Sequence, residues 1–238
     1  MQFRYRYSLL VLPLLSMSAS AQEQVVKIGH VGPLTGSIAH LGKDNENGAR
    51  MAIDALNAKG IKLQGKKVKF ELMAEDDGAN PQQATSVAQK LADAKVNGVV
   101  GHLNSGTTIP ASKIYHDHGI PQVSPSATNP KYTQQGYKGA FRVVANDGQL
   151  GGALGRYAAS TLKVKNIAIV DDRTAYGQGV ADEFAKAAKQ RASISSGANI
   201  PTTRQPTSTR FSLLSKARSP TWCSLAAWMR WAGRCCAR

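Results

Sequence analysis

Short apolar segments alternate with amphipathic segments of helical length from Val25 to Gln190, and this rhythm constrains the fold of the 238-residue chain more than any other feature. The apolar segments have the length of buried strands, and the segments between them repeat their apolar residues at the spacing of a helix face. Strands are expected at residues 25–32, 66–77, 96–103, 121–127, 139–144 and 166–172. Helices are expected at residues 47–60, 81–94, 109–119, 149–162 and 179–190. This alternation predicts βαβ units and a parallel sheet, which is an α/β fold.

The carboxyl ends of the expected strands are the place to look for a site, because open parallel sheets bind their ligands there. The segment "GHLNSGTT" (101–108) offers Ser105 with neighbouring hydroxyls at the start of an expected helix. Free N–H groups at a helix start suit a carboxylate or a phosphate. Hydroxyls at this position also serve as helix caps, and this segment alone favours neither interpretation. A second hydroxyl pair, Ser126 and Thr128, follows the next expected strand and favours a shared anion site.

The first 21 residues have the pattern of a secretory signal peptide. Two arginines precede an apolar run from Leu9 to Leu15, and the small residues 19–21 follow it. A transmembrane anchor is the alternative, but the run is far shorter than the ~20 residues that span a bilayer. We therefore expect export to the periplasm, with cleavage after Ala21 and a mature chain that starts at Gln22.

The net charge of +15 would favour a nucleic-acid partner if it were spread over the folded body. Residues 22–190 carry 20 Lys or Arg and 15 Asp or Glu, whereas residues 191–238 carry eight basic residues and no acid. The body therefore has an ordinary mixed surface, and no nucleic-acid partner is expected. Residues 1–222 contain no cysteine, so packing alone must stabilise the body.

No catalytic or cofactor motif stands out. The chain lacks a dinucleotide-binding glycine pattern and a Walker loop. His116 and His118 could suggest a metal site, but residues two apart on a helix point to different faces, which favours an exposed polar face. The acid pairs at 76–77 and 171–172 could be general acids, but tandem acids at strand ends are usually solvated caps. We expect neither an enzyme nor a bound metal or cofactor.

Three stretches resemble the periplasmic branched-chain amino acid-binding proteins, the Leu/Ile/Val-type receptors of ABC importers. They are "VKIGHVGPLTGSIAHLGKDNENGARMAID" (26–54), "GHLNSGTTIPASKIYHDHGIPQVSPSATNP" (101–130) and "IAIVDDRTAYGQGVADEF" (167–184). The resemblance implies a two-lobed α/β fold with parallel sheets that closes on its ligand about a hinge. By this resemblance residues 22–143 form the first lobe, and residues 144–190 begin a second lobe that is incomplete.

The resemblance also implies a ligand site. Ser105 and Thr128 would hold the α-carboxylate and the ammonium of an amino acid, together with backbone groups of Ser126 and Ala127. Tyr176 would close over the ligand from the second lobe. Leu41 stands where the family often places an aromatic ring against the aliphatic side chain.

The expected ligand is leucine, isoleucine or valine, and the expected partner of the intact form is an ABC permease in the inner membrane, with the receptor a monomer. Ala79 and Asn104 stand where some members have a disulfide, so that bond is absent. Ser126 replaces a frequent alanine, which leaves the side-chain preference open. A receptor of the same fold for an amide, a short-chain acid or urea is the first alternative, and an α/β hydrolase or dehydrogenase is the second.

After Gln190 both the resemblance and the βα rhythm are expected to end. Residues 191–238 hold all three tryptophans and all three cysteines, and they show no apolar period. Codons that straddle adjacent residues of "GANIPTTRQPTSTRF" (197–211) can read REYTNDKATDFNAI, which resembles the family's next segment. The same offset restores a strand-like sequence at the end of the chain. We therefore expect a frameshift near residue 190, with an irregular, out-of-frame tail that leaves the chain inactive.

Overall fold

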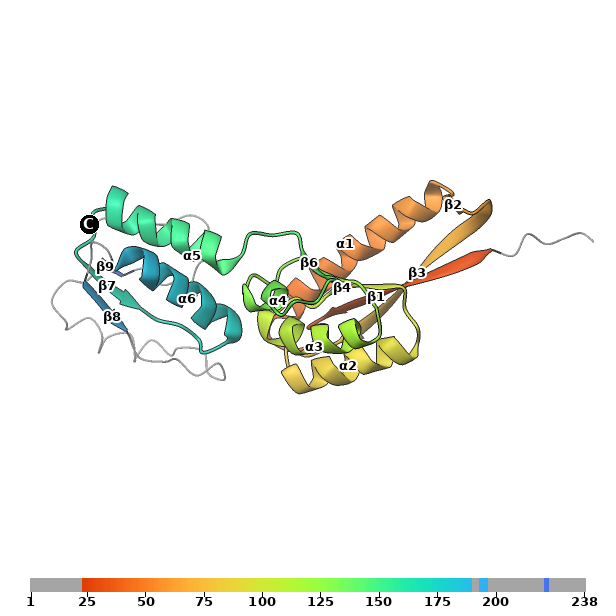
Figure 1. Cartoon of the computed structure of the whole chain (residues 1–238), viewed down its shortest axis with the longest axis horizontal. Coiled ribbons are helices and arrows are strands. Elements are labelled where there is room, and N and C mark those ends of the chain that lie inside the picture. Colours follow the sequence, from red (N-terminus) through yellow and green to blue (C-terminus); the bar gives the residue numbers. More distant parts are fainter. Residues whose placement is uncertain (1–22, 190–192, 197–220, 223–238) are drawn as a thin grey trace, which may run out of the picture.

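Two lobes of unequal size lie side by side in the computed structural model, which describes residues 23–189, 193–196 and 221–222 (Figure 1). The expected leader and most of the expected tail lie outside these residues. The larger lobe ends with a strand at Arg142, and the smaller one begins with a helix at Asp147. A short segment of the chain therefore joins the lobes.

A six-stranded sheet forms the centre of the first lobe, and its strand order is β2-β3-β1-β4-β5-β6. The strands are β1 (Gln24–Gly32), β2 (Lys62–Leu63), β3 (Lys66–Asp76), β4 (Gly98–Gly101), β5 (Gln122–Ser124) and β6 (Ala140–Arg142). All neighbours are parallel except β2, which forms an antiparallel hairpin with β3. The predicted parallel α/β fold is confirmed.

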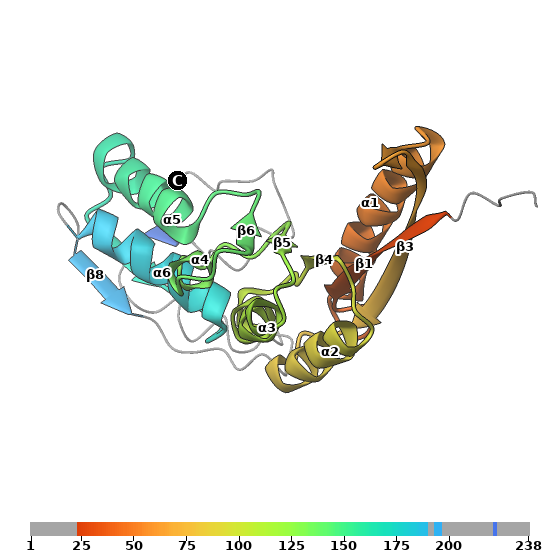
Figure 2. The same cartoon turned by 45° about the vertical axis from the view of Figure 1, so that its right-hand side comes forward.

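Helices cover both faces of this sheet. They are α1 (Ala39–Ala58), α2 (Pro81–Asp93), α3 (Ser105–Asp117) and the short α4 (Lys131–Gln134). In two views α1 lies on one face, and α2 and α3 lie together on the other (Figure 1, Figure 2). The chain passes through α1 to β3 on one side of β1, and then through α2 to β4 on the other side. The strand order reverses between β1 and β4, and such a switch point opens a crevice at the carboxyl ends of the strands.

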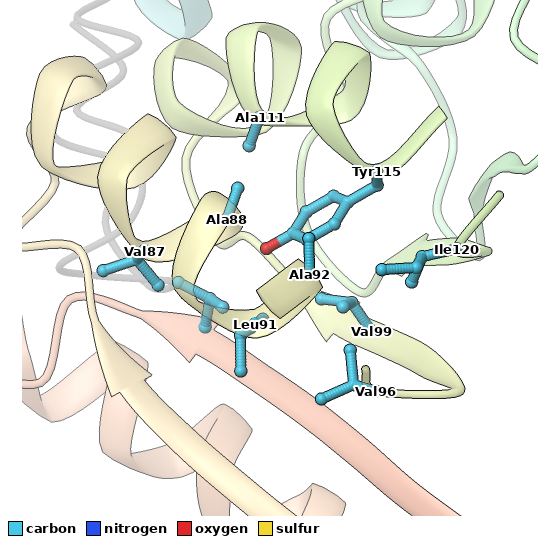
Figure 3. Packing of buried hydrophobic residues seen from close by; sticks show 10 residues of the cluster. Val87, Ala88, Leu91, Ala92, Val96, Val99, Ala111, Tyr115 and Ile120 are labelled. Carbon is cyan, nitrogen blue, oxygen red and sulfur yellow. The ribbon is translucent and has the colours of Figure 1, made fainter. Parts of the chain in front are cut away.

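The first-lobe core lies between this sheet and the pair α2 and α3 (Figure 3). Leu91 from α2, Val99 from β4 and Tyr115 from α3 are buried there. Gly29 lets α2 approach β1, because a Cβ at this position would lie 2.8 Å from a Leu91 methyl carbon. The core therefore holds α3, whose first turn belongs to the candidate site, firmly against the sheet.

Two helices of the first lobe begin earlier than expected. Helix α1 starts at Ala39 and α3 at Ser105, eight and four residues before the expected starts at 47 and 109. Their first turns carry small and polar residues without an apolar period, so the helix-face pattern does not include them. The α1 extension is instead fixed by tertiary contact, because Gly42 packs directly on the backbone of Pro33.

The second lobe contains α5 (Asp147–Arg156), a π-helical turn (Tyr157–Thr161), β7 (Asn166–Ile169) and α6 (Ala175–Ala188). Two further strands, β8 (Ser193–Ser196) and β9 (Thr221–Trp222), pair in parallel with β7 on its two sides. The expectation of a wholly irregular tail is therefore wrong at these two segments. Backbone pairing with an exposed strand needs no apolar side-chain period, so sequence periodicity could not reveal it.

Candidate ligand-binding site

The loops after β4 and β5 meet the second lobe at the carboxyl edge of the first sheet. Asn129, just after β5, donates a hydrogen bond from Nδ2 to the backbone oxygen of Ala175, 2.7 Å away at the start of α6. On the α3 side, a Cβ at Gly106 would lie 3.8 Å from the Ala175 Cβ. The loops that carry Ser105 and Thr128 therefore lie at the junction of the lobes, where a ligand can contact both.

Ser105 is the first residue of α3, and only 1% of its surface is exposed. Its Oγ accepts a hydrogen bond from the backbone N–H of Asn129, 3.2 Å away. This bond ties the start of α3 to the loop after β5. The first N–H groups of an α-helix have no partner within the helix, so Ser105 stands beside donors that suit a carboxylate.

The helix-cap interpretation does not hold for Ser105. The N-cap of α3 is Asn104, whose side chain caps nothing and whose buried Oδ1 has no partner among the described residues. The hydroxyls of Thr107 and Thr108 donate to the Asn104 backbone oxygen at 3.0 and 2.8 Å. These two hydroxyls are therefore used inside the fold, which leaves Ser105 as the candidate ligand contact of this turn.

Ser126 and Ala127 make hydrogen bonds to the loop after β4 and to the end of β5. The Ser126 hydroxyl donates to the Leu103 backbone oxygen at 2.9 Å, which links the loops after β5 and β4. The Ala127 N–H donates to the Ser124 Oγ, also at 2.9 Å. The Ser126 side chain and the Ala127 N–H therefore hold the loop in place.

Thr128 and Asp147 form a buried pair of groups without regular partners. Their exposed fractions are 7% and 0%. The Thr128 backbone oxygen accepts from the Asp147 N–H at 2.9 Å, so the two residues lie side by side. Within the described part of the chain, the Thr128 Oγ1 and both Asp147 carboxylate oxygens are buried and have no partner with regular hydrogen-bond geometry, although the Thr128 side chain lies close enough to the carboxyl to lower its pKa. Unpaired buried polar groups are rare in folded proteins, and here they converge at the lobe junction.

Asp147 was missed by the sequence interpretation, which weighed the acid pairs at strand ends and, by the resemblance, expected an acidic group for the ammonium beyond residue 190. Burial raises the pKa of its carboxyl above the ordinary value, and Glu183 acts in the same direction, whereas Thr128 and Arg142 oppose the rise. An ammonium beside the carboxylate would add to the positive charge of Arg142 and favour the ionised form. The signal in the sequence would have been an acid in the first turn of the helix that follows the strand expected at residues 139–144.

Tyr176 and Leu41 approach the same edge from two other elements. Tyr176 is half-buried in the first turn of α6, and its pKa is raised by burial and then by the negative charges of Asp147 and Asp172. Leu41 is half-buried in the first turn of α1, next to Gly42, which packs near Gly32 at the end of β1. The structure thus brings Ser105, Thr128 and Tyr176 to the junction and places Leu41 along the sheet edge.

The acid pair at 76–77 has two different roles. Asp76 accepts from the Leu34 N–H at 2.7 Å, which fixes the loop after β1. Asp77 is fully buried and contacts His102 Nδ1 at 2.8 Å, while His102 Nε2 lies 3.1 Å from the Tyr115 hydroxyl. The solvated-cap interpretation is wrong for Asp77, because this side chain is built into the core. The Asp77, His102 and Tyr115 side chains are all enclosed, so none of them can contact a substrate in this conformation.

The two histidines of the possible metal site, His116 and His118, contact residues of the protein close by. His116 stacks on Tyr137 with ring centroids 4.5 Å apart, and His118 contacts the Ile114 backbone oxygen at 2.9 Å. Both histidines are exposed, as expected for a polar helix face. In the described ranges there is no cluster of three or more metal-ligating side chains. Nor does any described helix combine the length and the apolar character that crossing a bilayer requires.

The family comparison agrees with this geometry. A sequence model described as "Periplasmic binding protein" matches residues 25–209, which is more than half of the chain. The chain belongs to this periplasmic binding protein family. The match begins at the first expected strand and runs past Gln190, where we expected the likeness to end.

Curated relatives of this periplasmic binding protein are named for amino acids. The chain is 41% identical over 176 residues to an amino acid binding protein of Pseudomonas aeruginosa, covering 74% of this chain and 46% of that protein. It is 44% identical over 161 residues to Leu/Ile/Val-binding protein homolog 1 of Brucella melitensis, covering 68% and 43%. It is 40% identical over 176 residues to the leucine-specific-binding protein of Salmonella typhimurium, covering 74% and 47%. The chain thus spans somewhat less than half the length of these relatives.

Solved structures show the same fold. A branched-chain amino acid transporter substrate binding protein of Streptococcus pneumoniae, in complex with isoleucine, has a TM-score of 0.71 at 27% identity. The match covers 81% of this chain and 54% of that one. A substrate-binding protein of Desulfitobacterium hafniense, in complex with Leu, has a TM-score of 0.63 at 28% identity over the same shares. The two-lobed fold is therefore shown, and this chain covers part of it.

Proposed function

We propose that the intact form of this protein is the solute-binding component of an ABC importer for branched-chain amino acids. The observation that carries the proposal is that the polar side-chain atoms of Thr128 and Asp147 are buried at the lobe junction, in neighbouring residues, without regular hydrogen-bond partners in the described part of the chain. A zwitterion supplies both the donors and the acceptors that such a site lacks. The names of the curated relatives support the same ligand class.

Five residues have a role in this proposal. The carboxylate accepts hydrogen bonds from the Ser105 hydroxyl and from the N–H groups at the start of α3. The ammonium donates to the Thr128 Oγ1 and lies against the Asp147 carboxylate, whose charge it neutralises. Leu41 lines the aliphatic side chain, and Tyr176 covers the ligand when the second lobe closes. A site with few fixed polar groups suits a small apolar side chain.

Calorimetric titration of the frame-restored protein with leucine, isoleucine and valine tests the ligand class. We expect saturable binding of at least one of them, with the unmodified amino acid recovered afterwards. Acetamide, propionate and urea serve as the comparison set for the alternative receptors. A tighter response to one of these three, or conversion of the ligand, would replace the proposal by a different receptor or by an enzyme.

We also propose export of the protein and transfer of its ligand to an inner-membrane permease. The family description and the leader pattern of residues 1–21 support the periplasmic location. Mass spectrometry of the periplasmic fraction should find a mature chain that starts at Gln22. Intact Met1 on periplasmic protein would contradict the proposed cleavage after Ala21.

The frameshift near residue 190 remains a proposal. It rests on the restored segments in the offset reading frame and on the concentration of Trp and Cys after residue 220. Sequencing the DNA around codon 190 tests it directly. If the DNA encodes residues 191–238 as given, the shift is not a sequencing error. If related strains carry the same shifted frame, the gene is a relic.

A further inference from the structure

Five lysines gather at the tip of the β2–β3 hairpin and the adjoining end of α1. They are Lys59, Lys62, Lys66, Lys67 and Lys69, and all five are exposed. Residues 59–69 contain no Asp or Glu, and their five charges equal the whole excess of positive charge over residues 22–190. We call residues 59–69 the lysine tip.

A tight turn holds the lysine tip in a narrow, protruding shape. Gln64 and Gly65 form the turn with φ values of 50° and 79°, the pattern of a two-residue hairpin of type I′. Lys62 pairs with Lys67 across the hairpin. Like charges directly opposite each other destabilise a sheet, so this arrangement is unfavourable for the isolated fold. A partner with negative charge would relieve the repulsion.

The lysine tip is fixed rigidly to the body. Asn57, in the last turn of α1, donates from Nδ2 to the Phe70 backbone oxygen at 2.9 Å and accepts from the Phe70 N–H at 2.8 Å. The Val68 N–H donates to the Ile61 backbone oxygen at 2.9 Å. The tip therefore keeps its shape when it meets a surface, and binding there costs little conformational entropy.

The lysine tip lies at the opposite end of the first lobe from the candidate ligand site. It stands where β3 begins, whereas the site lies where the parallel strands end. In both views the hairpin points away from the second lobe (Figure 1, Figure 2). A partner bound at the tip would leave the lobe junction accessible.

Most of the charge at the lysine tip is not neutralised by the protein. Lys67 lies 3.4 Å from Glu23 and Lys69 lies 2.9 Å from Glu71, both as exposed pairs. In the described part of the chain, Lys59, Lys62 and Lys66 have no ion-pair partner. Leu63 lies among them with 46% of its surface exposed.

We propose that the lysine tip docks on the headgroups of an anionic phospholipid bilayer, with Leu63 entering the interface. The lysines surround the hairpin on both faces, which suits mobile headgroups more than one fixed array of acids on a protein. Lysine acts as a point charge and does not form the planar paired contacts that arginine makes in specific recognition. The tip also lacks the aromatic and arginine anchors on which protein interfaces usually depend. Exposed apolar and basic residues on a rigid projection are the features that favour a membrane surface.

Co-sedimentation with vesicles of phosphatidylcholine and phosphatidylglycerol tests the proposal on the full 238-residue chain. The test variant replaces Lys59, Lys62 and Lys66 by Gln, which leaves both ion pairs of the tip in place. Each lysine near an anionic bilayer contributes about fivefold to partitioning, so the triple change should weaken binding roughly a hundredfold at 0.1 M NaCl. Wild-type binding through the tip should also weaken at 1 M NaCl, because the screening length falls to about 3 Å.

The matched control replaces Lys131, Lys138 and Lys165 by Gln. These exposed lysines lie outside the tip and have no ion-pair partner among the described residues, so the control loses the same net charge. It should bind nearly as well as the wild type. Equal losses in both variants, or no loss in either, would overturn the proposal in favour of non-specific attraction or of contact elsewhere in the chain.

Hydrogen–deuterium exchange locates the contact independently of total binding. Amides of residues 59–69 should gain protection on addition of anionic vesicles and not of pure phosphatidylcholine vesicles. Leu63→Ser should reduce this protection while the circular dichroism spectrum stays unchanged. Protection of the tip by soluble polyglutamate but not by anionic vesicles would assign it to an acidic protein and overturn the proposal.

Discussion

Thr128 and its neighbour Asn129 contact elements that lie far apart in the sequence. The Thr128 backbone oxygen accepts from the Asp147 N–H of the second lobe, while its buried hydroxyl stays without a regular partner. Its neighbour Asn129 bonds to Ser105 on α3 and to Ala175 on α6. Small changes at these residues should therefore alter ligand affinity more than the fold.

Removing either predicted hydroxyl should weaken leucine binding in the frame-restored protein. Ser105→Ala and Thr128→Ala each delete a hydrogen bond to a charged ligand group, which contributes about 1.5–3 kcal/mol. This corresponds to a loss of roughly tenfold to a hundredfold in affinity, measured by titration calorimetry. Ser86→Ala, at an exposed serine of α2 whose hydroxyl donates only to the Gln82 backbone oxygen, is the control and should bind normally. Wild-type affinity in both site variants would remove these residues from the site.

Asp147→Asn should stabilise the ligand-free chain at neutral pH. Because burial raises the pKa of the Asp147 carboxyl, its ionised form is less favourable in the folded than in the unfolded state. The folded chain therefore loses stability as pH rises from the ordinary value of 3.8 through the raised pKa, and it keeps that loss at pH 7. Asparagine removes the charge, so we expect the free energy of unfolding to rise by about 1–3 kcal/mol at pH 7. This gain should disappear when the pH falls below the ordinary pKa of 3.8.

Urea denaturation at several pH values measures this difference between the Asp147→Asn variant and the wild type. The same substitution should weaken leucine binding in the frame-restored protein, because the counter-charge of the ammonium is lost. A variant that is less stable than the wild type at pH 7 would show that the carboxylate is satisfied in the folded chain. Asp182→Asn, at an exposed acid of α6, is the control.

Helices α5 and α6 pack closely because α5 presents two glycines to α6 one turn apart. A Cβ at Gly151 would lie 2.6 Å from the Val180 backbone oxygen, and a Cβ at Gly155 would lie 2.5 Å from that of Phe184. This packing supports the start of α6, where Tyr176 and the lobe contact at Ala175 lie. The geometry of the second-lobe side of the site thus depends on residues that carry no side chain.

Gly155→Ala should destabilise the second lobe, because the added methyl group cannot be accommodated against the α6 backbone. Overpacking of this kind costs about 1–3 kcal/mol. Gly48→Ala is the matched control, since Gly48 lies in α1 with nothing within 4 Å of the added carbon. The control should gain up to about 1 kcal/mol from the better helix propensity of alanine. Chemical denaturation measures both, and equal effects would show that the α5–α6 contact is looser than described.

On the scale of the whole molecule, the described residues form a six-stranded first-lobe sheet and a small second lobe. The second lobe has a three-stranded sheet, in which β7 lies between β8 and β9. The curated relatives are more than twice as long as the parts that match this chain. A receptor that closes on its ligand obtains much of its affinity from the second lobe.

The 238-residue chain by itself should therefore bind no branched-chain amino acid measurably. Titration calorimetry with leucine checks this, in parallel with the frame-restored protein, which should bind. The first lobe should still be folded, because the sheet and the α2–α3 pair bury a continuous hydrophobic core between them. Micromolar leucine binding by the 238-residue chain would mean that the described part of the second lobe is sufficient for the site.

The sequence determined the fold class, because few other folds bury both the apolar strands and the apolar faces of the helices that alternate with them. It also placed Ser105 and Thr128 at strand ends, and the parallel strand order brings such ends to one edge. The start of α2 was equally local, since the Asn80 side chain accepts from the Gln82 and Gln83 N–H groups in front of Pro81. Residues close in the sequence control these features.

Tertiary structure alone decided the features that depend on distant residues. It buried Asp77 against His102, extended α1 by packing Gly42 on Pro33, and placed Asp147 beside Thr128. It also paired β8 and β9 with β7 by backbone hydrogen bonds, which any sequence can supply. Periodicity reports which face of an element is buried, but it cannot report which residues of other elements lie opposite. The candidate site is built from such long-range neighbours, so its acidic member emerged only from the folded chain.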